Sequence, residues 1–130
     1  MGTIPELSRA EYNILKVLWA KGRQSVREVH DLVQEKQGWA YSTTKTMMDR
    51  MAKKGLLERE TFHGVFVYRA LVSRPAGLVR FIQFFAERVL ETDPATVVTL
   101  FAKNETLSEA EIAELNRLLE EGEADEEEGA

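Results

Sequence analysis

A polar, cationic helix face in the middle of the chain is the feature best suited to chemistry. Projected at about 100° per residue, residues 43–54 place an apolar stripe on one side, made of Thr44, Met47, Met48 and Met51. The opposite side carries Ser42, Lys45, Thr46, Asp49, Arg50 and Lys53, with Thr43 at its edge. An α-helix fits the DNA major groove, where hydroxyls reach base edges or phosphates and arginine binds guanine. The pattern therefore predicts a DNA-reading helix, and a solvated face with a Lys45–Asp49–Lys53 charge ladder is the alternative.

Further cations follow this helix. Lys54 lies at its C-terminal end, and Arg59 and Arg69 lie in the next two apolar segments. Such side chains can contact phosphates, which supply affinity without sequence information. They are equally compatible with ordinary charges at the edge of a strand.

Catalysis and metal binding find little support. The chain has no cysteine and two histidines, His30 and His63, neither of which lies in a metal-ligand spacing or beside a plausible nucleophile. We interpret both as surface or half-buried side chains. The sequence predicts no enzyme activity, no metal site and no cofactor.

Charge is unevenly distributed. The chain carries −5 overall, but residues 1–74 hold 13 Lys and Arg against 8 Asp and Glu, whereas residues 75–130 hold 4 against 14. A basic N-terminal part and an acidic C-terminal part suggest that a polyanionic partner binds the N-terminal part only. The absence of cysteine, of an apolar run of about 20 residues and of signal-peptide features at the N-terminus favours a cytoplasmic protein without a membrane partner.

The cationic helix lies within a predicted winged-helix unit. Ser-x-x-Glu capping boxes at Ser8 and Ser25 begin helices of about 9–20 and 26–36, the second with Val26, Val29, Leu32 and Val33 turned inward. After the helix of 43–54, residues 57–62 and 65–71 are rich in β-branched and aromatic side chains, with His63-Gly64 between them, which predicts a hairpin. Three helices followed by a hairpin form a winged helix-turn-helix, so we assign residues 1–74 to a DNA-binding domain.

The rest of the chain is predicted to be helical and self-associating. Helices of about 77–91, 95–103 and 109–121 follow, and three short helices enclose little core of their own. We therefore expect residues 75–120 to form a dimerisation domain, with packing against the front domain as the alternative. The acidic residues 121–130 are predicted to be a disordered tail. The expected dimer contacts are Leu78, Phe81, Ile82, Phe84, Phe85, Val89, Leu100, Phe101, Ile112 and Leu115.

Several segments together resemble the penicillinase-repressor family (the BlaI/MecI/CopY group). They are Leu7–Tyr12 with Val17–Trp19, Thr43–Leu57, Gly64–Tyr68 and Phe101–Leu119, which together span roughly residues 7–120. The resemblance implies a cytoplasmic, homodimeric winged-helix repressor that binds a promoter-overlapping operator dyad. It also implies that Thr43 and Thr46 face bases, and that Ser42 replaces a lysine common in relatives.

Two departures from the family bear on regulation. Some relatives are cleaved by a protease at an Asn-Phe bond, where this chain has Leu100-Phe101. The copper-responsive branch uses a cysteine-rich metal site, which a chain without cysteine cannot form. A sensor or protease partner is therefore left unidentified. Because winged helices also serve as protein adaptors, a protein-interaction module without specific DNA binding is the alternative function.

Overall fold

The computed structural model describes residues 7–104 and 107–129, with side chains described as far as residue 121. Residues 7–73 form one compact unit, and the chain from Arg74 onward forms another. Residues 1–6, assigned above to the first domain, and Ala130, assigned to the tail, lie outside the described residues.

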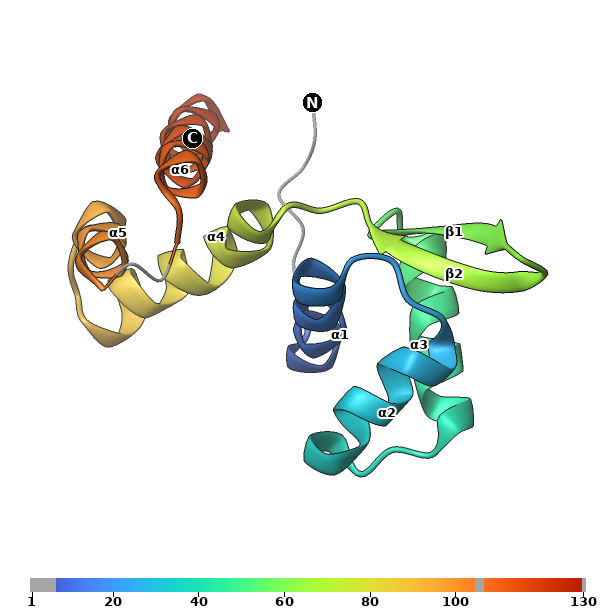
Figure 1. Cartoon of the computed structure of the whole chain (residues 1–130). Coiled ribbons are helices and arrows are strands. Elements are labelled where there is room, and N and C mark those ends of the chain that lie inside the picture. Colours follow the sequence, from blue (N-terminus) through green and yellow to red (C-terminus); the bar gives the residue numbers. More distant parts are fainter. Residues whose placement is uncertain (1–6, 105–106, 130) are drawn as a thin grey trace. The chain divides into compact units, whose positions relative to one another are not determined.

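Three helices form the framework of the first unit (Figure 1): α1 (Arg9–Lys21), α2 (Val26–Gln37) and α3 (Tyr41–Lys53). Both predicted capping boxes are confirmed, because Ser8 and Ser25 each accept from the backbone amide three residues on while Glu11 and Glu28 reach back. α3 begins at Tyr41, two residues earlier than predicted, after Ala40, which makes no side-chain cap.

The predicted hairpin is confirmed and completes the winged helix. β1 (Leu57–Phe62) pairs with β2 (Val65–Ala70) in antiparallel register, with Phe62 opposite Val65. Both turn residues have positive φ, 50° at His63 and 80° at Gly64. This two-residue geometry matches the right-handed twist of the strands. Gln24 adds a short bridge to the outer edge of β2 through two backbone hydrogen bonds with Tyr68.

The core of the first unit is built by all five elements. Its buried members are Ile14, Leu15, Leu18, Val26, Val29, Val33, Met48, Met51, Leu56, Leu57 and Tyr68. The prediction that Leu32 turns inward is wrong, because its side chain is 48% exposed. His30, which was expected at the surface or half-buried, is instead buried on this side of α2. The inward stripe of α2 thus follows Val26, Val29, His30 and Val33.

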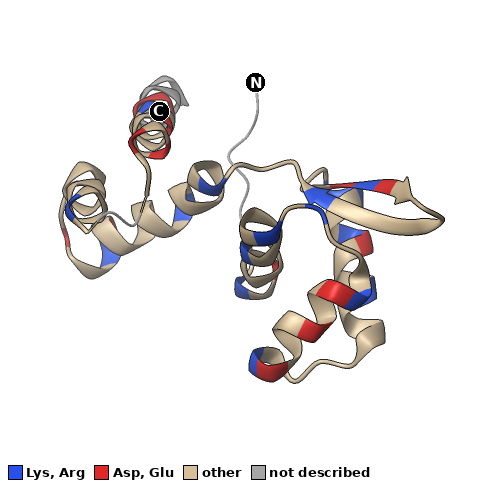
Figure 2. Ribbon diagram, in the orientation of Figure 1, with Lys and Arg blue, Asp and Glu red and all other residues tan. Residues whose placement is uncertain are grey.

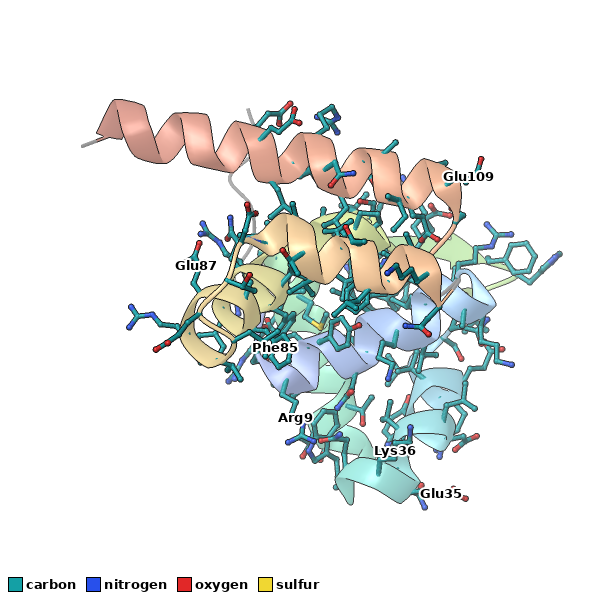
Figure 3. The ribbon with its side chains drawn as sticks, turned by 90° about the vertical axis from the view of Figure 1, so that its left-hand side faces the viewer. Arg9, Glu35, Lys36, Phe85, Glu87 and Glu109 are labelled. Atoms are coloured by element: carbon teal, nitrogen blue, oxygen red, sulfur yellow. The ribbon has the colours of Figure 1, made fainter. Side chains whose placement is uncertain are left out.

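The second unit consists of α4 (Arg74–Phe84), a π-helical turn η1 (Phe85–Val89), α5 (Pro94–Lys103) and α6 (Glu109–Gly129). Asp93 caps α5 through its side chain, which accepts from the Ala95 amide. α6 packs against α4 and α5, and it runs alongside α5 while crossing α4 (Figures 1 and 3). It continues through residues 121–129, where composition had predicted disorder. Glutamate, which supplies five of these nine residues, is a strong helix former, and that propensity favours continuation.

The second unit has a core of its own, contrary to the expectation that its helices would enclose little. The buried cluster comprises Val79, Ile82, Ala86, Val97, Val98, Leu107, Leu115 and Leu119. Ile82 and Leu115 were predicted dimer contacts. Because they are 3% and 0% exposed within this core, we remove them from that surface. Helices that cross one another bury apolar stripes even when each helix is short.

Candidate nucleic-acid interface

α3 separates a buried apolar side from an exposed polar one, as its sequence predicts. Thr44, Met48 and Met51 are fully buried, and Met47 is half-buried. The exposed side consists of Ser42, Thr43, Lys45, Thr46, Arg50 and Lys53. Two hydroxyls one turn apart and a cationic C-terminal half are therefore held on a helix whose back is fixed by the core. This rigid presentation leaves the polar groups free to meet a ligand in solvent.

A buried hydrogen bond anchors the N-terminal end of α3 to α2. His30 Nδ1 and Thr44 Oγ1 lie 2.9 Å apart, and both side chains are buried. The His30 ring meets the Tyr41 ring edge-on at 5.6 Å, and the Arg27 guanidinium lies 4.4 Å from the Tyr41 ring centroid. Sequence reasoning missed this anchor. The position of His30 one residue after Val29 and three before Val33, on the apolar stripe of α2, was the available signal.

Asp49 ties α3 to the hairpin instead of joining a charge ladder along the helix. Tyr68 Oη donates a 2.6 Å hydrogen bond to Asp49 Oδ1. Burial, together with this hydrogen bond to a carboxylate, raises the pKa of Tyr68 to about 12. The carboxylate is half-buried beneath the exposed face of α3. Asp49 is thereby occupied within the fold, and the outer face keeps the charge of Lys45, Arg50 and Lys53.

The last cation of this region is also held within the fold. Lys54 Nζ lies 2.8 Å from Glu11 Oε2, which joins the end of α3 to the first turn of α1. Burial alone would raise the pKa of Glu11, but hydrogen bonds from Lys54 and Ser8 outweigh it and lower the pKa of this carboxyl. Lys54 remains largely exposed while paired. Its predicted phosphate contact would therefore compete with Glu11.

The two arginines of the hairpin lie on opposite faces of it. In the observed register Arg59 is opposite Tyr68 and Arg69 is opposite Glu58, and cross-strand partners share a face. Arg59 thus shares the face that contacts α3 through Tyr68, and its guanidinium lies 4.4 Å from the Phe66 ring centroid. Arg69 is paired at 3.0 Å with Glu58 and at 2.9 Å with Glu60. Only Arg59 is therefore placed beside α3.

Charged residues of both signs occur across the first unit, and along α2 three acidic residues lie between Arg27 and Lys36 (Figure 2). The positive character of the interface therefore comes from local arrangement on α3. Among the described residues, no group of His, Asp or Glu side chains is placed to hold a metal ion. His63 is exposed in the hairpin turn. In the same part of the chain, no helix combines the length and the apolar character needed to cross a membrane.

Comparison with known proteins gives one family. The family model described as penicillinase repressor matches residues 7–121. The penicillinase repressor of Bacillus licheniformis is 31% identical over 121 residues, covering 93% of this chain and 94% of that protein. The methicillin resistance regulatory protein MecI of Mammaliicoccus sciuri is 28% identical over 114 residues, covering 88% and 93%.

A solved structure with a similar fold contains DNA. It is the solution structure of the Bacillus licheniformis BlaI monomeric form in complex with the blaP half-operator. It matches with a TM-score of 0.52 and 32% identity, and the match covers 58% of this chain and 93% of that one.

Proposed function

The chain belongs to the penicillinase repressor family, and from this premise we propose that it is a DNA-binding transcriptional repressor that acts as a dimer on an operator dyad. The observation that carries the proposal is α3. Its back is fully buried and its outer side presents hydroxyls and cations. A helix of this kind matches the width of the major groove. If the operator overlaps a promoter, the bound repressor blocks transcription. We place the protein in the cytoplasm, where it would meet this DNA.

Each exposed side chain of α3 has a distinct role in the proposal. Thr43 and Thr46 read base edges near the N-terminal end of α3, and Arg50 binds guanine from the next turn. Phosphates on either side position the helix without reading sequence. The residues assigned to phosphates are Ser42, Lys45, Lys53 and Lys54 on α3 and its end, with Arg59 on the hairpin.

The proposed division of labour follows the two units. The first unit (residues 7–73) binds DNA, and the second unit, from Arg74 onward, holds two copies together. The similar BlaI structure is of a monomeric form on a half-operator, which supports one winged helix per half-site. The surface proposed to join the copies is the exposed remainder of the predicted dimer contacts, around Phe81, Phe84, Phe85 and Val89. Two linked winged helices would read half-sites about one helical turn apart.

Thr46→Ala tests the base-reading role. Loss of one base contact weakens operator binding by about 1–3 kcal/mol, which is roughly 5- to 150-fold. The measurement is a gel-shift titration on the promoter of the chain's own gene and on random DNA of the same length. We expect the loss on the promoter and little change on random DNA.

The matched control is Thr99→Ala, an exposed helical threonine of the second unit whose hydroxyl bonds only its own helix at Ala95. Operator affinity should not change in this variant. An equal loss on promoter and random DNA for Thr46→Ala contradicts base reading. Failure of the native protein to bind any genomic fragment at low salt contradicts the whole proposal and favours a protein-interaction module.

A further inference from the structure

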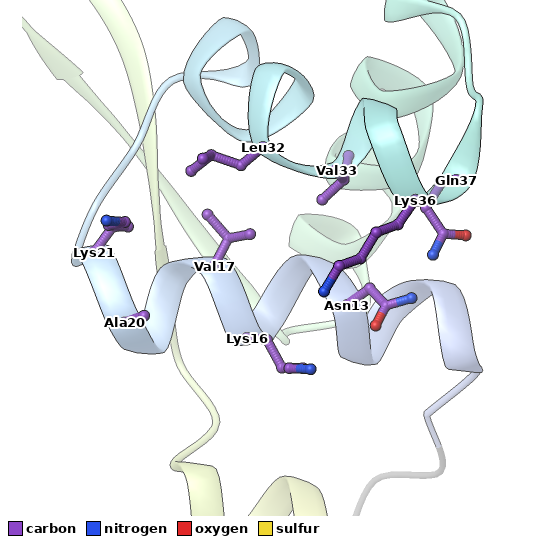
Figure 4. A pocket seen from close by; sticks show the side chains of 9 residues that line it. All are labelled: Asn13, Lys16, Val17, Ala20, Lys21, Leu32, Val33, Lys36 and Gln37. Carbon is purple, nitrogen blue, oxygen red and sulfur yellow. The ribbon is translucent and has the colours of Figure 1, made fainter.

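A cavity of about 200 Å³ lies between α1 and α2, within the first unit (Figure 4). Its lining comes from the middle and C-terminal half of α1 and from the last turns of α2. The lining residues are Asn13, Lys16, Val17, Ala20, Lys21, Leu32, Val33, Lys36 and Gln37. None of them belongs to the proposed DNA-reading face of α3.

The middle of this cavity is apolar and partly open. Val17 and Leu32 point toward each other across it, and Val33 lies beside them at its closed side (Figure 4). Leu32 leaves 48% of its surface exposed on a helix whose neighbouring valines are buried. Exposing that much of a leucine forgoes about half of the 1.5–3 kcal/mol that its burial would contribute. The exposed part of Leu32 therefore offers a bound apolar group a surface that the fold itself does not cover.

The rim of the cavity is cationic. Lys36 of α2 points toward α1 beside the Asn13 amide, and Lys21 and the Gln37 amide also line the cavity (Figure 4). Lys16 is among the lining residues, but its side chain points away from α2, and its Nζ lies 5.8 Å from the Tyr12 ring centroid (Figure 4). No carboxylate is among these described lining residues. Lysines around a concave apolar surface concentrate positive potential there. The polar groups thus select a negative charge, and the amides can donate hydrogen bonds to it.

We propose that this cavity binds a small amphipathic carboxylate, with a short hydrocarbon body against Val17, Leu32 and Val33 and a carboxylate among the lysines. Ligand sites are typically concave and mostly apolar, with a few converging polar groups, and this cavity has that composition. Its volume is below the roughly 300–1,000 Å³ typical of drug-sized ligands. The ligand is therefore a compact acid. The site does not overlap the proposed operator-binding face, and its test does not depend on DNA binding.

Hexanoate is the probe for this site. The ¹⁵N-labelled full-length protein is titrated with hexanoate, with 1-hexanol as the uncharged counterpart and acetate as the counterpart without a hydrocarbon body. We expect saturable shifts for hexanoate with a dissociation constant on the order of millimolar, confined to amides of residues 13–21 and 32–37. Hexanol and acetate should each bind several-fold more weakly. Shifts that are scattered, or equal for hexanoate and acetate, overturn the proposal.

Two variants locate the charge and the apolar wall. Lys36→Gln removes one exposed cation and should weaken hexanoate about two- to five-fold, with no effect on hexanol. Leu32→Ser should weaken both probes. Both positions are on the surface of α2, so the fold should tolerate them, and unchanged amide spectra without ligand verify this. The matched control is Lys103→Gln, an exposed lysine of α5, which should leave hexanoate binding unchanged. Native-like hexanoate binding by Lys36→Gln, or an equal loss in the control, contradicts the assigned site.

Discussion

The two units use their exposed rings in opposite ways. In the first unit, the exposed rings of Tyr41, Phe62 and Phe66 each lie under an arginine guanidinium at 4.2–4.4 Å. In the second unit, the exposed rings follow one another along α4 and η1 and continue into exposed aliphatic residues. The second set comprises Phe81, Phe84, Phe85, Val89 and Leu90.

This difference indicates which kind of partner the surface of each unit suits. The first unit closes its core and covers its outlying rings with its own cations, so its surface is suited to a charged ligand such as DNA. The second unit closes a smaller core and still presents a continuous apolar face. Contiguous exposed apolar surface is typical of an interface with another protein. A second copy is the occupant that operator dyads would require.

The largest expected effect comes from placing a charge on that apolar face. Phe85→Asp should convert dimers to monomers and abolish dyad binding, because burying an unpaired carboxylate in an apolar interface costs several kcal/mol. We expect dimerisation to weaken at least about 100-fold. Light scattering measures the mass, and gel shifts on the intact dyad and on a half-site measure DNA binding.

Leu71→Asp is the control for that substitution, since Leu71 is 46% exposed and Phe85 44%, but Leu71 belongs to the first unit. The mass of this control should equal that of the native protein. An unaltered dimer for Phe85→Asp contradicts the assigned interface. Dissociation in both variants would mean that dimerisation does not depend specifically on the apolar face of the second unit.

The next effect distinguishes residues of α3 that stabilise the first unit from residues of α3 that face solvent. Thr44→Val keeps the shape of a fully buried side chain but removes the hydroxyl that His30 contacts. A buried imidazole nitrogen left without a partner should lower the free energy of unfolding by about 1–3 kcal/mol. Urea unfolding followed by circular dichroism measures the change. Thr43→Val, on the exposed side of the same turn, should alter stability by less than about 0.5 kcal/mol, and equal losses would contradict the division of α3 into two sides.

Local sequence patterns predicted most elements of the fold. Capping boxes, the β-branched and aromatic segments that follow the helix of 43–54 and the His63-Gly64 turn each act through near neighbours, and all three were confirmed. The same holds for α3, because helical periodicity decides which side chains share a face. The exposed set on α3 was therefore predictable from the sequence alone.

Partners distant in the sequence were not predictable in this way. Asp49 was expected on the outer face of α3, with a charge ladder as the alternative, but it contacts Tyr68, because the hairpin brings the Tyr68 hydroxyl against α3. Arg69 was grouped with Arg59, but strand register places the two on opposite faces. Ile82 and Leu115 satisfied the apolar pattern of an interface and are instead inside the core of the second unit. Periodicity identifies an apolar side chain and leaves open which neighbour covers it.

A smaller effect concerns the ion pair that each unit places on a capping-box glutamate. In the second unit, Ser108 and Glu111 form a capping box at the start of α6 through reciprocal hydrogen bonds of 3.0 and 3.1 Å. Arg74 Nη2 lies 2.6 Å from Glu111 Oε1. Hydrogen bonds from Arg74 and from the Ser108 backbone lower the pKa of Glu111 from 4.5 to about 2. A lowered carboxyl pKa contributes stability that is complete above the ordinary value and is lost as pH falls toward 2. Because Arg74 is 40% exposed, solvent screening limits the contribution to about 1 kcal/mol.

Glu111→Gln isolates this pair, since glutamine preserves the capping box while removing the charge. Urea unfolding monitored through α6 amide signals should show the native protein more stable than the variant at pH 7. The difference should shrink between pH 4.5 and 2. Glu121→Gln, which removes an exposed pair with Arg117, is the control and should change stability at pH 7 by less than about 0.5 kcal/mol. A difference that persists at pH 2 contradicts the ionic origin.

The smallest expected effect distinguishes the two hairpin arginines. Arg59 is available to a charged ligand, whereas Arg69 is held by carboxylates of the same hairpin. Arg59→Gln should weaken operator binding and lower the slope of log affinity against log salt by about 1, since one phosphate contact is lost. Arg69 is neutralised by Glu58 and Glu60 on the other face. Arg69→Gln should therefore change affinity by less than about two-fold and leave the slope intact. Gel shifts across a salt series measure both variants. A lower slope for Arg69→Gln would show that DNA binding displaces its glutamates, and that both faces of the hairpin contact the backbone.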